Sequence, residues 1–206
     1  GLVPALLVLQ AAMFISGTAT HLLARRSKGM FLAQLLLPIS RWHLATAKGI
    51  GELVVGGIAA APVLVVVVGF AGAVGWLRVG AGASVVFVGA SLLTALVLGA
   101  TATAIGLFIG TWSRSQEQVA LLSLVGIVAF AMVASFFALA ALPPVDAMAL
   151  LPVAGLVHAL RLLIAGDGSI VWFTVALVIT SLTALGIVRV AARWFDAERL
   201  ILRAAM

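Results

Sequence analysis

Few residues in this chain could do chemistry, and they are widely spaced. The three histidines stand at positions 21, 43 and 158, and there is no Cys to share a metal site with them. The sequence has no H-E-x-x-H, no paired Cys/His spacing and no G-x-x-x-x-G-K-[ST] phosphate-binding loop. We therefore expect no catalytic residues, no metal and no cofactor held by this chain.

The acidic residues offer two weak alternatives. Hydrolase chemistry would have to draw on Asp146, His158, Asp167 and Ser169. Turn and helix-capping roles suit these residues better. Glu52 is the one carboxylate expected inside an apolar segment, and Lys48 precedes it by four residues. This spacing favours an ion pair on one helix face, because a proton or cation relay would recruit several intramembrane acids.

A polar strip runs along the first apolar segment. Gly17 and His21 follow Gln10 by seven and eleven residues, which are close to whole helical turns, and Ser16 stands beside Gly17. Such a strip faces either other helices or a water-filled path. Helix packing and the lining of a transport pathway by Gln10, Ser16, Gly17 and His21 are both open interpretations.

The elements that must position these residues are apolar helices. Hydrophobic residues make up 65% of the chain and charged residues 9%, against about 25% charged residues in soluble domains. The composition predicts an all-α integral membrane protein, with one transmembrane domain over residues 1–206. Five segments are long enough to cross a bilayer, namely residues 2–24, 49–77, 83–112, 119–142 and 170–192.

A basic segment, residues 25–48, separates the first two spans. Its apolar run from Met30 to Leu37 is too short to cross a bilayer and ends at Pro38, which cannot continue a regular helix. A short amphipathic helix on the membrane surface satisfies both facts. We expect this helix to transmit force from a soluble partner to the membrane bundle.

Residues 147–165 are apolar but contain Pro152, His158 and Arg161, between the turn signals Pro143-Pro144 and Gly166-Asp167-Gly168. We interpret them as a re-entrant or interfacial helical hairpin broken near Pro152. The histidines are then interfacial side chains, satisfied by water or lipid headgroups.

Charge predicts the orientation. If five spans cross and residues 147–165 do not, ten of the twelve Lys and Arg residues fall on one side, and only Arg78 and Arg161 on the other. The positive-inside rule makes the first side cytoplasmic, including the 193–206 tail, which is expected to be a surface helix. The first span then starts outside, so we expect a sixth, N-terminal span to precede Gly1.

Two further patterns concern helix ends and helix contacts. Residues 115–118, Ser-Gln-Glu-Gln, match a capping box that opens the 119–142 span.

The 83–112 span carries small residues at four-residue spacing, including a G-x-x-x-G at Gly106 and Gly110. Small residues let helix backbones approach closely in lipid, although the spacing does not name a partner helix.

The whole chain resembles the permease subunits of type-2 ATP-binding-cassette (ABC) exporters, in the branch related to sodium-extrusion and multidrug permeases. Three stretches carry the likeness. Residues 29–48 are similar to the coupling segment, residues 109–120 to the second inner loop, and residues 150–166 to the re-entrant hairpin. The matching residues of the first stretch are Gly29, Pro38, Ser40, Arg41, Lys48 and Gly49. Arg25, Arg26 and Leu32 stand where acidic residues are usual.

The resemblance implies a function. The chain would be the permease half of an exporter in a prokaryotic plasma membrane, moving a lipophilic substrate by alternating access. Cytoplasmic ABC ATPase subunits holding ATP and Mg²⁺ would drive it, and a second permease copy or paralogue would complete the path. The implied ATPase-coupling residues are Gly29, Phe31, Leu35, Pro38, Ser40, Arg41, Arg114 and Glu117. A membrane scaffold subunit and an ion-coupled carrier are the alternatives, and no nucleic acid is expected.

Overall fold

The computed structural model of this chain describes residues 2–27, 43, 46–47, 49–51, 54, 81–139 and 146–194. The elements within these ranges are all helical. They are α1 (Leu2–Ser27), α4 (Ala81–Trp112), α5 (Gln116–Leu139), the 3-10 helix η1 (Asp146–Leu150), α6 (Ala154–Ala165) and α7 (Ile170–Trp194). Four of them, α1, α4, α5 and α7, are long and apolar enough to span a membrane. The prediction of an all-α membrane protein is confirmed.

Four of the five predicted spans overlap helices of the structure. The predictions were residues 2–24, 83–112, 119–142 and 170–192, and the helices there are α1, α4, α5 and α7. The predicted 49–77 span, most of the 25–48 segment and the tail beyond Trp194 lie outside the described residues. The Lys48–Glu52 pair also lies outside them.

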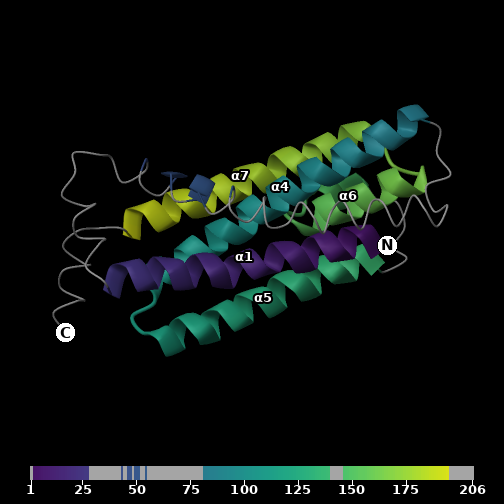
Figure 1. Cartoon of the computed structure of the whole chain (residues 1–206). Helices are drawn as coiled ribbons and strands as arrows, with labels where there is room; N and C mark the ends of the chain where they lie inside the picture. The colour runs from purple at the N-terminus through teal and green to yellow at the C-terminus, as the bar shows by residue number, and fades with distance from the viewer. Residues whose placement is uncertain are drawn as a thin grey trace.

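The long helices form a bundle with one reversed member (Figure 1). Helices α1, α4 and α7 run in the same direction, and α5 runs in the opposite direction along α1, on the outer side of the bundle. We call the end that carries η1 and α6 the hairpin end. Since α5 finishes and α7 begins at this end, residues 146–165 form no further crossing.

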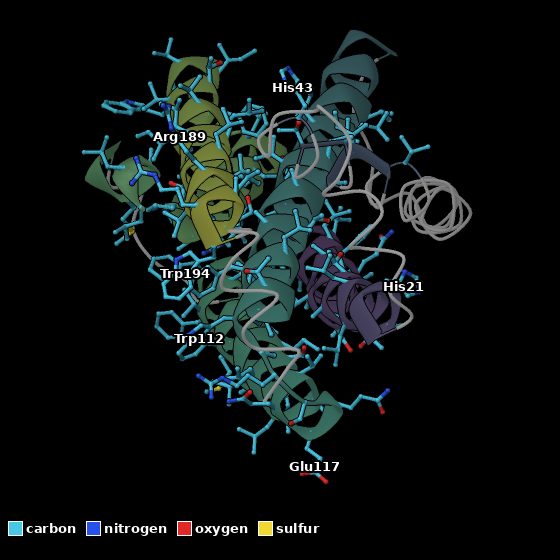
Figure 2. The ribbon with its side chains drawn as sticks, turned by 90° about the vertical axis from the view of Figure 1, so that its left-hand side faces the viewer. His21, His43, Trp112, Glu117, Arg189 and Trp194 are labelled. Atoms are coloured by element: carbon cyan, nitrogen blue, oxygen red, sulfur yellow. The ribbon has the colours of Figure 1, made fainter. Side chains whose placement is uncertain are left out.

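The opposite end gathers basic and aromatic residues, and we call it the basic end (Figure 2). Of the six Lys and Arg residues in the described ranges, only Arg161 belongs to the hairpin end. The other five are Arg25, Arg26, Arg114, Arg189 and Arg193. Trp112 and Trp194 close α4 and α7 at the basic end, as expected for side chains at a membrane interface.

Helices α1 and α4 approach each other through glycine. A Cβ added at Gly106 would lie 2.6 Å from the Ile15 carbonyl oxygen and 2.9 Å from Thr18 Cβ. One turn later, a Cβ at Gly110 would lie 3.1 Å from the Ala19 carbonyl oxygen. The G-x-x-x-G therefore has a definite partner, the backbone of α1, and leaves no room there for a larger residue.

The start of α5 is capped by its own sequence. The Gln118 backbone N–H donates to Ser115 Oγ at 3.2 Å, and Gln118 Oε1 accepts the Arg114 backbone N–H at 2.9 Å. The predicted cap at Ser115 is confirmed, with the return bond from position 118 displaced by one residue to Arg114. This capping lets the chain reverse between α4 and α5 within three residues.

The hairpin breaks at a strained turn. Val153 has φ 63° and ψ −61°, and the Ala154 N–H donates to the Pro152 carbonyl at 2.6 Å. These values define the rare positive-φ γ-turn, which is costly for a β-branched residue. The Val153 N–H donates across to Thr180 Oγ1 on α7 at 3.2 Å, and Thr180 Oγ1 donates to the Ala176 carbonyl at 2.8 Å. Thr180 thus ties the turn to α7.

Substitution of Thr180 by Val is expected to destabilise the hairpin by about 1–3 kcal/mol, because the partly buried Val153 N–H loses its acceptor. Differential scanning fluorimetry of the detergent-solubilised protein and protease sensitivity of residues 146–165 measure this loss. Thr180→Ser, which keeps the hydroxyl, is expected to retain most of the stability.

The matched control is Thr183→Val. The Thr183 hydroxyl donates to the Ile179 carbonyl of its own helix at 2.9 Å, so its loss should leave hairpin proteolysis unchanged. Equal proteolysis of the Thr180→Val and Thr183→Val proteins would contradict the role given to Thr180.

Candidate functional site

Two of the residues expected to meet a soluble partner lie at the basic end. Arg114 and Glu117 are both exposed, in and just after the turn that joins α4 to α5, and Glu117 projects away from the bundle (Figure 2). The other residues of that set lie outside the described ranges, namely Gly29, Phe31, Leu35, Pro38, Ser40 and Arg41. Their segment begins beyond Ser27, at the basic end of α1.

The chain comes back to the bundle near the same end. A Cβ added at Gly49 would lie 3.4 Å from Leu107 Cδ1, so the chain contacts α4 again one residue after the 25–48 segment. The candidate coupling residues of the α4–α5 turn and both flanks of the 25–48 segment are therefore associated with one half of the bundle.

The polar strip on α1 lies away from the contact between α1 and α4. Gly17 and His21 are exposed, Gln10 and Ser16 are half-buried, and a Cβ at Gly17 would have nothing within 4 Å. The face of α1 that packs on α4 carries Ile15, Thr18, Ala19 and Leu22 instead. The strip is thus not the packing face of α1 against α4.

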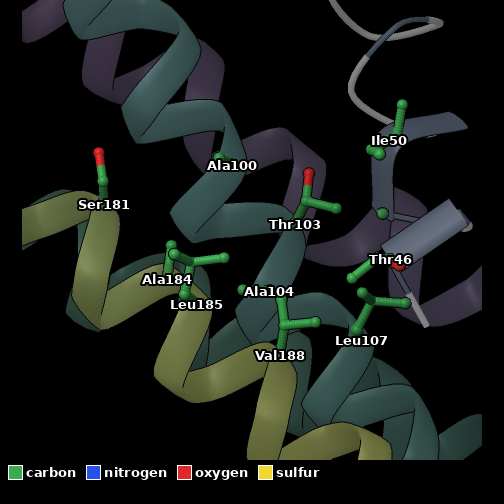
Figure 3. Close-up of a pocket in the computed structure, with 11 residues that line it drawn as sticks. Thr46, Ile50, Ala100, Thr103, Ala104, Leu107, Ser181, Ala184, Leu185 and Val188 are labelled. Carbon is green, nitrogen blue, oxygen red and sulfur yellow. The ribbon is translucent and has the colours of Figure 1, made fainter. Parts of the chain in front are cut away.

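A pocket of about 350 Å³ lies between α4 and α7 (Figure 3). Its α4 wall is formed by Ala100, Thr103, Ala104 and Leu107, and its α7 wall by Ser181, Ala184, Leu185 and Val188. Thr46, Gly49 and Ile50 form the third side. The lining is almost entirely apolar, and none of the four polar-strip residues contributes to it.

The four long apolar helices are those of a membrane protein, and a comparison with known families shows which family the chain belongs to. The family model of the ABC-2 type transporter matches residues 3–164. The chain belongs to the ABC-2 type transporter family. The family match begins in α1 and ends inside α6, so α7 lies beyond it. Searches of curated proteins and of solved structures return no match.

Membership has direct consequences. The chain is the permease component of an ABC transporter and a multi-pass membrane protein, and an ABC-2 domain has no ATPase site of its own. The resemblance to type-2 ABC permeases is confirmed at this level. The narrower branch of sodium-extrusion and multidrug permeases stays a prediction.

One histidine of the ABC-2 permease is not where the sequence suggested. The prediction of an interfacial side chain is wrong for His158, which is 2% exposed. Residues 154–160 of α6 are all buried, and the His158 ring meets the Phe137 ring of α5 edge-on, with centroids 6.5 Å apart. The imidazole packs inside the hairpin end because α6 is enclosed by α5 and α7.

Ser169 has the capping role expected of it. Its Oγ accepts the Val171 N–H at 3.2 Å at the start of α7. Gly166, with φ 84°, ends α6, and its N–H donates to the Leu163 carbonyl. Among the described residues of the permease, these contacts are structural, and no group of three His, Asp or Glu side chains could hold a metal ion.

The sequence analysis overlooked the α7 wall of the pocket and Thr180. A signal existed, since Thr180, Ser181 and Thr183 stand close together in the middle of an apolar helix. Thr103 of α4 lines the same pocket. Its position in a pocket depends on where α7 packs, and α7 is 67 residues or more further along the chain.

Proposed function

We propose that this ABC-2 permease exports a lipophilic substrate from the cytoplasm, powered by separate ABC ATPase subunits. The supporting observation is the common location of the candidate coupling elements. The α4–α5 turn with Arg114 and Glu117, the end of α1 at Ser27 and the return of the chain to α4 at Gly49 all lie in the basic half of the bundle. One soluble motor could therefore contact both elements.

The basic end is the cytoplasmic one in this proposal. Five of the six Lys and Arg residues in the described ranges stand there, which agrees with the positive-inside rule. The hairpin end then faces outward, in the plasma membrane of a prokaryote. ATP and Mg²⁺ bind to the motor subunits, because the ABC-2 domain lacks an ATPase site.

A second permease copy or paralogue completes the transport path, since the described helices form one bundle rather than two symmetric halves. ATP binding brings the motor subunits together and moves the 25–48 segment. That movement switches the paired bundles between inward-facing and outward-facing states. The apolar helices of the permease favour a lipophilic cargo over a charged one, because a charge would lose its hydration among apolar side chains.

The test is reconstitution of the permease with its ATPase in inside-out vesicles, using a fluorescent lipophilic dye as cargo. We expect dye accumulation that requires ATP and Mg²⁺ and is abolished by inactivating the ATPase. Accumulation driven by an ion gradient without ATP would contradict the proposal. Failure to co-purify with any ATPase would also contradict it.

A further inference from the structure

The exposed face of α7 changes from apolar to basic along the helix. Val171, Val178 and Leu182 are 64%, 48% and 60% exposed. Arg189 and Arg193 are exposed on the same helix at the basic end. Successive separations of seven, four, seven and four residues keep these five side chains on one side of an α-helix. We propose that this face of α7 binds an anionic phospholipid from the leaflet at the basic end, with both guanidinium groups on its phosphate.

The depth of Arg189 gives the first reason. Trp194 ends α7 at the basic end, and Arg189 precedes it by five residues, or about 7.5 Å at 1.5 Å per residue. Since a tryptophan at a helix end marks the headgroup level, the backbone of Arg189 lies at the edge of the hydrocarbon. A guanidinium at this depth extends along its own side chain to the headgroups and is costly without an anionic partner.

The described residues supply no carboxylate on this face. The acidic residues among them are Glu117, Asp146 and Asp167, and none of the three belongs to α7. Asp146 and Asp167 stand at the hairpin end, and Glu117 lies far from Arg189 across the basic end (Figure 2). The helix dipole favours a cation in the last turn, which accounts for Arg193 but not for Arg189. A phosphate from the membrane provides the missing anion.

A second copy of the chain fits this face poorly. In a two-fold interface the same patch is present on both partners, so a contact through this face would bring four guanidinium groups together. Like charges that meet across an interface oppose association. A soluble acidic partner would neutralise the arginines but could not cover Leu182, which lies deeper in the membrane than Arg189. A phospholipid matches both parts, because it joins an anionic headgroup to apolar chains.

The apolar part of the face has the length of one leaflet. Val178 precedes Arg189 by eleven residues, or about 16.5 Å along the axis, and half of a bilayer core of about 30 Å is about 15 Å. Open space lies on the same side one turn before the arginines, since a Cβ added at the exposed Gly186 would have nothing within 4 Å. An acyl chain can therefore lie against the helix between Arg189 and Val178.

The experiment is photolabelling of the whole permease in phosphatidylcholine vesicles that contain a small fraction of a probe lipid. The two probes are phosphatidylglycerol and phosphatidylcholine with the same diazirine-bearing acyl chain, and labelled residues are mapped by mass spectrometry. We expect residues 178–186 to be labelled at least about fivefold more strongly by the phosphatidylglycerol probe. One basic residue near an anionic headgroup contributes about a fivefold preference.

The arginines are tested by a paired substitution. Arg189→Gln combined with Arg193→Gln should reduce labelling by the phosphatidylglycerol probe to the level of the phosphatidylcholine probe, whose own labelling should not change. The matched control is Arg114→Gln, which removes a positive charge from the exposed turn between α4 and α5 and should preserve the preference. Equal labelling by both probes in the unchanged protein, or an equal loss in the Arg114→Gln protein, would overturn the proposal.

Saturation distinguishes a binding site from general contact with the bilayer. As the fraction of the phosphatidylglycerol probe rises, labelling of residues 178–186 should approach a plateau. Labelling that stays proportional to the probe fraction would contradict a site on α7. The proposal does not depend on the export function, because labelling is measured without ATP and without a motor subunit.

Discussion

Replacing Gly106 with Ala is expected to destabilise the permease by about 1–3 kcal/mol, the usual cost of overpacking a tight contact. The new methyl group would lie 2.6 Å from the Ile15 carbonyl oxygen, and backbone cannot rotate away as a side chain can. Alanine favours helix over glycine by up to about 1 kcal/mol, but the collision with α1 is the larger effect. Scanning fluorimetry in detergent measures the fall in Tm.

The control is the same substitution elsewhere on α4. A Cβ at Gly89 would have nothing within 4 Å, so Gly89→Ala should keep or slightly raise Tm through helix propensity alone. A Gly106→Ala protein as stable as the Gly89→Ala protein would show that α1 and α4 are further apart than the structure places them. Gly110→Ala should be intermediate, because one of its neighbours is the flexible Leu22 side chain.

Leu35→Glu is expected to reduce ATP-driven transport to background while leaving the bundle folded. Leu35 belongs to the apolar run predicted to lie at the membrane surface, and a carboxylate there would remove the apolar face that such a helix needs. The measurement is dye transport in vesicles, together with ATPase co-purification and Tm. Loss of transport with unchanged Tm is the expected pattern.

Leu35→Met, which keeps the position apolar, is the matched control and should transport normally. Single changes at the exposed turn, Arg114→Ala and Glu117→Ala, should lower transport partially, because each removes one contact of a broader surface. Full transport by Leu35→Glu would remove the coupling role from this segment. An equal loss in Leu35→Met would instead indicate a general packing defect.

Much of the fold can be predicted from local sequence. Long apolar runs predict α1, α4, α5 and α7. An apolar segment that crosses a lipid bilayer has to satisfy its backbone N–H and C=O groups internally, and a helix does so. The cap at Ser115 is also local, because it depends on residues within one helical turn. The spacing of Gly106 and Gly110 predicts a close helix contact, but it does not predict which helix makes that contact.

The candidate site depends on non-local packing and is harder to predict. The burial of His158 results from α5 and α7 enclosing α6, and periodicity within α6 contains no information about its neighbours. The γ-turn at Val153 opposes the intrinsic preference of valine and exists because a hydroxyl 27 residues away accepts its N–H. The pocket likewise requires the juxtaposition of α4 and α7.

The glycine contact between α1 and α4 also limits how this protein can change shape. Helices whose main chains touch at Gly106 and Gly110 cannot slide past each other without collision, so they would travel as one rigid body. Relative motion is easier where side chains leave a void, and the described helices leave one along the seam of α4 and α7. A pair of engineered cysteines across that seam should therefore report motion during turnover, while a pair joining α1 to α4 should stay at constant separation.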